Sequence, residues 1–251
     1  MKLYFYGLVI FSGVILGFRL VEKKASSYQF SSSEIEQIFV GLIPSAIIGA
    51  RLYHVLSWLT YYRMFPHEIF YFWQGGLGIY GALVGGFIFL LLYSKWEKIN
   101  FWRLIDLLSA PTLLCQAVGR LGNYFNDEVF GPPTSLPWKV FITPDKRPLQ
   151  FLQESYFHPI FLYEALLLLL AFIFLSKKEP NLRNETGALA GLYFVSYGLI
   201  RFLTEFLRFE TWRIANLKVA QIISVFFILF GLYLYERGIR SQKLIKSNRK
   251  I

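Results

Sequence analysis

The sequence alternates between long apolar runs and short polar segments. Each apolar run is about as long as the roughly 20 helical residues that cross the hydrocarbon core of a bilayer. We predict membrane-spanning helices at residues 3–20, 37–58, 76–94, 104–122, 159–176, 188–208 and 216–235. The predicted fold class is all-α: a polytopic membrane helix bundle of about seven transmembrane helices, formed as a single integral membrane domain over residues 1–251.

The composition supports a membrane protein. Hydrophobic residues make up 55% of the chain and the mean hydropathy is +0.44, which is unusual for a soluble domain. Aromatic residues reach 19%, and many Tyr and Trp residues lie near the ends of predicted spans, as at membrane interfaces. No small-x-small cleavage site follows the first apolar run, so we expect an uncleaved span rather than a signal peptide.

The distribution of basic residues predicts an orientation. The net charge is +10, and in a seven-span arrangement more than half of the 26 Lys and Arg residues fall on one side. Positive charge accumulates on the cytoplasmic side, so we expect the N-terminus outside and the C-terminus in the cytoplasm. Membrane lipids are the expected partners of this charge, and no nucleic-acid motif is visible. The residues on this side are Arg19, Lys23, Lys24, Lys95, Lys98, Arg103, Lys177, Lys178, Arg183, Arg237, Arg240, Lys243, Lys246, Arg249 and Lys250.

The longest outer connection, residues 123–158, contains closely spaced prolines. They include the Gly131-Pro132-Pro133 turn signal, and Pro144 and Pro148 follow. Such spacing opposes regular helix, so we predict an irregular extracytoplasmic lobe. A lobe of this kind could hold an extended peptide.

Several polar residues lie at the outer end of the fourth predicted span. Arg120, Asn123, Asn126 and Glu128 follow the apolar run 104–118 and emerge where the hydrocarbon ends. Charged and amide groups at this depth are costly and usually mark a functional site. If the helix continues, Arg120 and Asn123 share one face at a spacing of three.

A second group of polar residues lies in the sixth predicted span. Tyr197, Arg201 and Glu205 follow one another at spacings of four, which places them on one helical face. Glu164, inside the fifth apolar run, needs a cationic partner, and we expect one of the two arginines; a purely structural pair is the alternative. In this arrangement Arg120 and Arg201 converge near the outer leaflet, where guanidinium groups bind a lipid phosphate bidentately.

Other polar residues within the spans have structural interpretations. Arg51 either neutralises an acid inside the bundle or extends to a headgroup. His54 is expected to be a hydrogen-bonded bundle residue rather than a base. Asp106 is expected to cap a helix or to pair with Arg103.

Three motifs resemble those of the prolipoprotein diacylglyceryl transferase family. Residues 119–131 fill every fixed position of G-R-x-G-N-x-x-N-x-E-x-x-G, residues 158–164 match H-P-x-x-L-Y-E, and residues 197–208 match Y-x-x-x-R-x-x-x-E-F-x-R. The resemblance implies transfer of the diacylglyceryl group of phosphatidylglycerol to the lipobox cysteine of a prolipoprotein, with a thioether formed and glycerol phosphate released. It also implies prolipoprotein signal peptides as partners and a location in the bacterial cytoplasmic (inner) membrane.

The resemblance and the residue chemistry together suggest roles for individual side chains. Arg120 and Arg201 are expected to bind and stabilise the phosphate. The remaining candidates position these arginines, the headgroup or the peptide; for Tyr6 the alternative is an interfacial anchor. They are Asn123, Asn126, Glu128, Tyr197, Glu205, Glu164, His158 and Tyr6. No cofactor or metal is expected, because the three histidines are scattered and the substrate supplies the nucleophile. The single cysteine, Cys115, is expected to be a small buried residue.

One position departs from the family pattern. Where the family has His-Gly-Gly, this chain has Tyr80-Gly81-Ala82. A tyrosine with an unperturbed pKa of about 10 is a poor base. Three interpretations follow. We favour the first, in which the family histidine is not an obligatory base. In the second, Tyr80 acts as the base together with a nearby arginine, and in the third this homologue is inactive. A membrane transporter or lipid-binding protein for an anionic ligand is the alternative function.

Overall fold

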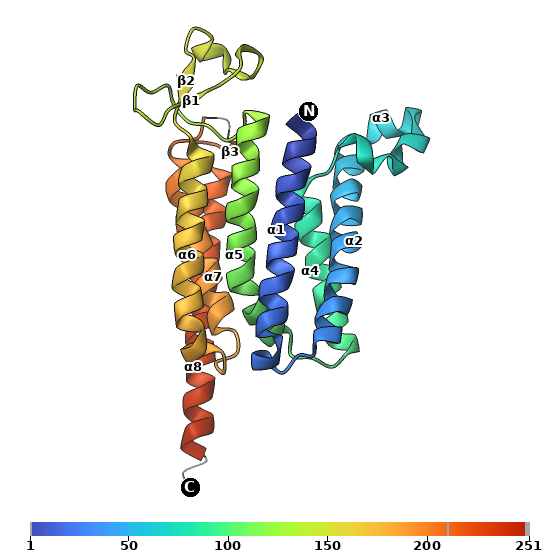
Figure 1. The fold of residues 1–251 in the computed structure, drawn as a ribbon, viewed down its shortest axis with the longest axis vertical. Helices are drawn as coiled ribbons and strands as arrows, with labels where there is room; N and C mark the ends of the chain where they lie inside the picture. The colour runs from blue at the N-terminus through green and yellow to red at the C-terminus, as the bar shows by residue number, and fades with distance from the viewer. Residues whose placement is uncertain (1, 210, 249–251) are drawn as a thin grey trace. The chain divides into compact units, whose positions relative to one another are not determined.

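The computed structural model describes residues 2–209 and 211–248, and most of them are helical (Figure 1). The contacts divide the chain into two compact units. One unit combines the residues up to Lys24 with those from Ile105 onward, and the other runs from Ala25 to Leu104.

The first unit contains most of the long helices. Its core is an apolar cluster centred on Leu113, Leu168 and Leu175, against which residues of the next helix such as Leu192 and Ile200 pack. Because the helices alternate in direction along the chain, one end of this unit collects the start of α1, the end of α5, the start of α6 and the end of α7 (Figure 1). The helices are α1 (Lys2–Ala25), α5 (Phe101–Asn126), α6 (Ile160–Leu182), α7 (Ala188–Glu205) and α8 (Val219–Asn248).

Small residues bring the helices of this unit close together. A Cβ atom added at Gly191 of α7 would lie 2.6 Å from the carbonyl oxygen of Gly231 in α8. The thiol of Cys115 in α5 donates to the carbonyl oxygen of Gly13 in α1 at 3.1 Å, and the residue is only partly exposed. Cys115 therefore takes part in helix packing.

An irregular lobe joins α5 to α6. Its short strands β1 (Val140–Phe141) and β2 (Tyr156–Phe157) pair antiparallel. Two short 3-10 turns, Pro144–Lys146 and Leu149–Phe151, lie between the strands. The irregular lobe predicted for residues 123–158 is therefore present, although α5 continues to Asn126 before the lobe begins.

Asp106 of α5 caps the beginning of α7. Its carboxylate, 2% exposed, accepts the backbone N–H groups of Gly187 at 2.6 Å and Ala190 at 2.8 Å. These groups belong to the first turn of α7, where backbone N–H groups lack helical partners. The expected capping role of Asp106 is confirmed, although the helix that it caps is α7 and not its own helix α5. Among the described residues, Arg103 does not pair with Asp106; it donates to the side chain of Gln29 at 2.8 Å.

The second unit is a helical pair with a long connection. α2 (Ser32–Ser57) begins with a capping box between Ser31 and Glu34 and packs along α4 (Ile79–Trp96). The connection contains α3 (Leu59–Met64) and the 3-10 turns Pro66–Phe70 and Phe72–Gln74.

Arg51 organises this connection. Its guanidinium donates to the carbonyl oxygens of Glu68, Ile69, Gly75 and Gly76 over 2.5–3.1 Å. Of the two interpretations of Arg51, an acid partner or a headgroup, the structure shows no acid partner among the described residues, because the donors of Arg51 are used by backbone carbonyl groups that a turning loop leaves unpaired.

Six helices of the described residues are long and apolar enough to cross a membrane, so the chain is a multi-pass membrane protein. They cover Phe5–Tyr28, Ser32–Ser57, Ile79–Trp96, Phe101–Asn126, Ile160–Leu182 and Val219–Ser241. The remaining predicted span, residues 188–208, contains α7, which carries Arg201 and Glu205 near its end and is not among these six helices. That α7 also crosses the membrane stays a prediction.

We expect Gly49→Ala to destabilise the second unit. The new Cβ atom would lie 2.3 Å from the carbonyl oxygen of Gly81, so α2 and α4 must separate. Overpacking of this kind costs about 1–3 kcal/mol. Thermal unfolding in detergent should show a lower midpoint, whereas Gly7→Ala, where nothing lies within 4 Å of the added Cβ, should not. Equal midpoints for the two variants would contradict the packing argument.

Candidate active site

Three arginines lie close to one buried carboxylate. This cluster is at the end of the first unit from which the lobe extends. Glu164 lies on the first turns of α6 with its side chain 2% exposed. Its Oε2 atom lies 2.7 Å from Nε of Arg120. Its Oε1 atom lies 2.7 Å from Nη2 of Arg208 and 3.5 Å from Nη1 of Arg201. The expectation that Glu164 pairs with a site arginine agrees with these distances.

The last turn of α7 supplies two further polar contacts. Nη2 of Arg201 lies 2.8 Å from Oε2 of Glu205, a pair at the predicted spacing of four. The hydroxyl of Thr204 donates to Oε1 of Glu164 at 2.8 Å. Arg201 therefore lies between two buried acids, one on its own helix and one on α6.

The charges of this cluster do not cancel. Three guanidinium groups face the two carboxylates of Glu164 and Glu205. The side chains of Arg120 and Arg201 are 25% and 22% exposed, so both reach the surface of the unit. Within the part of the chain that the structure describes, the terminal nitrogens of Arg120 have no hydrogen-bond partner. The cluster can therefore accept an anion, and a phosphate oxygen pair suits paired guanidinium groups.

Asn123 and Glu128 connect the end of α5 to the turn that follows it. Nδ2 of Asn123 donates to Oε2 of Glu128 at 3.1 Å, and the backbone N–H of Glu128 donates to the carbonyl of Asn123 at 3.0 Å. Asp127 and Val129 have φ of 54° and 58°, which turns the chain away from the helix. Gly122 leaves room for the ring of Tyr6, whose Cδ2 atom would lie 2.9 Å from an added Cβ.

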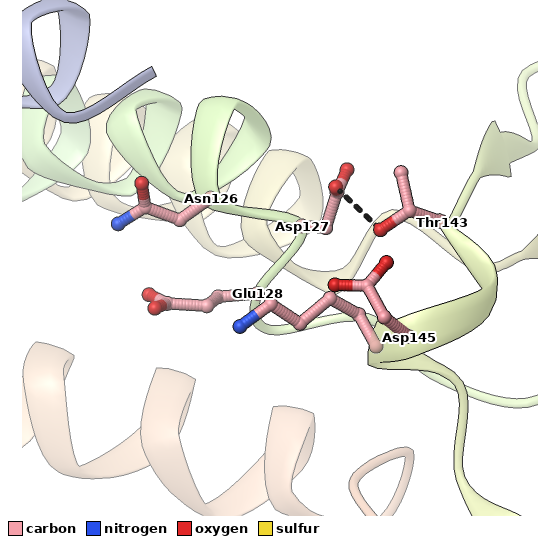
Figure 2. Close-up of a pocket in the computed structure, with 6 residues that line it drawn as sticks. Asn126, Asp127, Glu128, Thr143 and Asp145 are labelled. Carbon is pink, nitrogen blue, oxygen red and sulfur yellow. Dashed lines mark hydrogen bonds between the residues drawn. The ribbon is translucent and has the colours of Figure 1, made fainter. Parts of the chain in front are cut away.

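A cavity of about 410 Å³ lies between the end of α5 and the lobe. Figure 2 shows the side chains of Asn126 and Glu128 pointing in a common direction, while Asp127 accepts a hydrogen bond from Thr143 of the lobe at 3.1 Å. The side chains that line the cavity are polar or charged. It is lined by Asn126, Asp127, Glu128, Thr143, Asp145 and Lys146.

Comparison with known proteins identifies the family. The sequence matches the family described as prolipoprotein diacylglyceryl transferase over residues 1–236. The chain belongs to this family. Among its relatives, a phosphatidylglycerol–prolipoprotein diacylglyceryl transferase of Synechococcus elongatus is 40% identical over 231 residues, covering 90% of this chain and 80% of the relative.

Two further relatives carry the same name. The protein of Synechocystis sp. is 36% identical over 257 residues, covering 96% of this chain and 90% of the relative. The protein of Thermotoga petrophila is 40% identical over 233 residues, covering 92% of this chain and 79% of the relative. The resemblance found in three short motifs thus extends over nearly the whole chain.

His158 and Tyr197 have partners other than the arginine cluster. The Nδ1 atom of His158 lies 3.0 Å from the hydroxyl of Tyr163, which also accepts from Nε1 of Trp138 at 2.8 Å, so His158 supports the base of the lobe. Tyr197 stacks on Tyr193 with ring centroids 6.1 Å apart and joins the apolar core. Among the described residues, no hydrogen bond joins Tyr197 to Arg201.

Tyr80, which replaces the family histidine, lies in the other unit. It belongs to the first turn of α4, is 62% exposed, and its ring centroid is 5.9 Å from that of Tyr53. Its hydroxyl has no hydrogen-bond partner within residues 2–209 and 211–248. No group of three His, Cys, Asp or Glu side chains in those same residues is arranged to hold a metal ion.

Three residues of the cluster were not predicted from the sequence. Arg208 is the last fixed position of the Y-x-x-x-R-x-x-x-E-F-x-R motif, and its place three residues after Glu205 could have identified it. Thr204 lies directly before Glu205 but has no distinctive sequence signal. Lys218 donates from its Nζ atom to the carbonyl oxygens of Glu205 at 2.5 Å and Arg208 at 2.8 Å. This contact joins a side chain to a distant backbone, which no local pattern predicts.

We expect Glu164→Gln to lower stability strongly. The substitution keeps the side-chain size but leaves three guanidinium groups without their shared charge, and breaking a buried ion pair costs about 3–5 kcal/mol. Thermal unfolding in detergent measures the effect. The control is Glu236→Gln on α8, which removes an exposed pair with Arg240 and should leave the midpoint unchanged. An unchanged midpoint for Glu164→Gln would show that the carboxylate does not hold the cluster together.

Proposed function

We propose that this chain transfers the diacylglyceryl group of phosphatidylglycerol to the cysteine thiol of prolipoproteins. The observation that carries the proposal is the pair of guanidinium groups, Arg120 on α5 and Arg201 on α7, that share the buried Glu164. Membership of the family and the names of the relatives support the choice of substrates.

The phosphate of the lipid is the group that the arginines bind. Among the described residues the terminal nitrogens of Arg120 have no hydrogen-bond partner, and both arginines reach the surface of the unit, where a lipid headgroup arrives. Two guanidinium groups at fixed positions supply parallel N–H donors to phosphate oxygens. Their positive charge also stabilises the negative charge that grows on the leaving phosphate in the transition state.

The reaction is a displacement at carbon. The thiolate sulfur of the prolipoprotein cysteine attacks the glyceryl carbon that is esterified to phosphate, and a carbon–sulfur bond forms. The carbon–oxygen bond to the phosphate breaks, and its electron pair leaves on the oxygen of glycerol phosphate. The thiol proton is released. The nucleophile belongs to the substrate, and a thiol is a few per cent ionised near neutral pH, so the reaction does not require a histidine at position 80.

The polar residues at the end of α5 position the reactants. The side-chain amide of Asn123 donates to Oε2 of Glu128 at 3.1 Å. Asn126 and Glu128 line the cavity next to the lobe. We assign Asn123, Asn126 and Glu128 to the headgroup and to the polar peptide that follows the lipobox cysteine. Tyr6 packs against Gly122, two residues after Arg120 in α5, and closes the site on the α1 side.

The charge distribution supports an orientation. The end of the first unit opposite the lobe carries Lys23 and Lys24 at the end of α1 and Lys177 and Lys178 near the end of α6. We infer that this end is cytoplasmic, since basic residues concentrate on that side. The lobe, the cavity and the arginine cluster then face the outside of the cytoplasmic membrane.

Substitution of the arginines tests the proposed chemistry. Arg120→Lys and Arg201→Lys keep one positive charge but lose the planar pair of donors, and we expect kcat/KM to fall about 100-fold or more. Transfer from phosphatidylglycerol to a lipobox peptide measures it. Arg19→Lys, in an exposed pair with Glu22, should retain full activity. Normal turnover by either site variant would refute the assignment.

The same assay separates the alternatives. A wild-type protein that binds phosphatidylglycerol but forms no thioether would be an anion-binding or transport protein. A large gain of activity in Tyr80→His would identify the natural chain as an impaired homologue.

Cysteine labelling tests the orientation. In a Cys115→Ser background, we expect Ser135→Cys in the lobe to react with a membrane-impermeant maleimide in intact spheroplasts, and Lys178→Cys to react only after lysis. Both side chains are exposed in the wild-type protein. The reverse pattern would place the site on the cytoplasmic side.

A further inference from the structure

A short hairpin returns the chain to the end of α7. Strands β3 (Arg213–Ile214) and β4 (Leu217–Lys218) pair antiparallel, with Arg213 opposite Lys218. Ala215 in the connecting turn has φ of 52°. The hairpin brings Lys218 back to α7, where its Nζ atom donates to the carbonyl oxygens of Glu205 at 2.5 Å and Arg208 at 2.8 Å.

The carbonyl of Glu205 belongs to the last residue of α7, and that of Arg208 lies in the turn that follows the helix. The last carbonyl groups of a helix lack helical partners and carry about half a negative charge in total. This end of α7 also carries Arg201, which we assign to the lipid phosphate. An anion bound here would be repelled by the exposed carbonyl groups. The ammonium of Lys218 covers one of them, the carbonyl of Glu205, together with the carbonyl of Arg208 just beyond the helix, and places a positive charge at this end.

Lys218 also fixes the backbone from which Arg208 extends. Arg208 follows the end of α7, and its side chain lies 2.7 Å from Glu164. The carbonyl of the same residue is one of the two acceptors of Lys218. Release of this carbonyl would loosen the last turn and with it one of the three arginines that surround Glu164.

The charged surroundings of Lys218 are those of the cluster. Partial burial lowers the pKa of Lys218 from that of a free lysine, and Glu205 opposes this shift. Arg213 of the hairpin and Arg201 and Arg208 of the α7 region lower the pKa further by repulsion. The charge of Lys218 is therefore coupled electrostatically to the arginines of the site.

We propose that Lys218 is a positioning residue for the lipid phosphate: it caps the carbonyl end of α7 and adds a positive charge behind Arg201 and Arg208. The proposal rests on the proposed function, because it assumes that the cluster binds phosphatidylglycerol. It assigns to the hairpin between α7 and α8 a role in lipid binding.

Lys218→Met tests the proposal. We expect KM for phosphatidylglycerol to rise about three- to tenfold, the range for one charge at a helix end, with a smaller change in kcat. Lys218→Arg should restore the wild-type KM. The matched control is Arg213→Met, which removes one charge from the same hairpin; Arg213 is exposed and has no ion pair among the described residues. An equal rise of KM in both Met variants, or no rise in Lys218→Met, would overturn the proposal.

The pH dependence gives a second readout. Because Lys218 acts in its protonated form and its pKa lies below that of a free lysine, binding of fluorescent phosphatidylglycerol should weaken as pH rises through this pKa. Lys218→Arg should not show this alkaline weakening. Its persistence in Lys218→Arg would assign it to another group and overturn the proposal.

Two comparisons keep the outcomes distinct. If Lys218→Met unfolds, Lys218→Gln is measured in its place. Gln keeps an N–H donor but has no charge, so KM should still rise. An unchanged KM in Lys218→Gln would overturn the proposal. If Lys218→Met binds phosphatidylglycerol as tightly as wild type while Arg201→Lys does not, only the role of Lys218 fails. Normal transfer by Arg120→Lys and Arg201→Lys would instead refute the proposed function.

Discussion

The site depends on one buried carboxylate. Glu164 is almost fully enclosed, yet it lies within 2.7 Å of Arg120 and Arg208 and 3.5 Å of Arg201. A single guanidinium buried near hydrocarbon would be expensive without a countercharge. The carboxylate of Glu164 offsets part of the cost of burying three guanidinium groups. Because it carries only one negative charge, the net charge of the three arginines and Glu164 remains positive. The same residue therefore provides stability and anion affinity.

Local periodicity allowed much of this arrangement to be predicted. The spacing of four between Arg201 and Glu205 is a property of any helix, so their pairing followed from the sequence alone. The convergence of Arg120 and Arg201 followed from alternating helix directions and a count of spans. Both inferences depend on the regular geometry of a helix, and they succeed because α5 and α7 are continuous through these residues.

Contacts between side chains and distant backbone could not be predicted. Arg51 was expected to meet either an acid or a headgroup but donates to carbonyl groups of a turning loop, and Lys218 donates to the end of a helix. A carbonyl group is present at every position, so no residue type marks it as a partner. Tyr197 lies on the predicted face of α7, but the apolar core takes up its ring. Asp106 was correctly expected to cap a helix, although its sequence neighbourhood did not show which one.

The polarity of α7 has a consequence for biogenesis. Arg201 and Glu205 disfavour insertion of this helix by itself, because charged residues oppose partition from the translocon, by a few kcal/mol each at mid-bilayer and by less near the end of a span. Its countercharge Glu164 is synthesised earlier, on α6, whereas α8 and Lys218 emerge from the ribosome later. If α7 crosses the bilayer, it should remain near the translocon until α8 follows, and the C-terminal helices should enter the lipid together as a hairpin rather than one at a time.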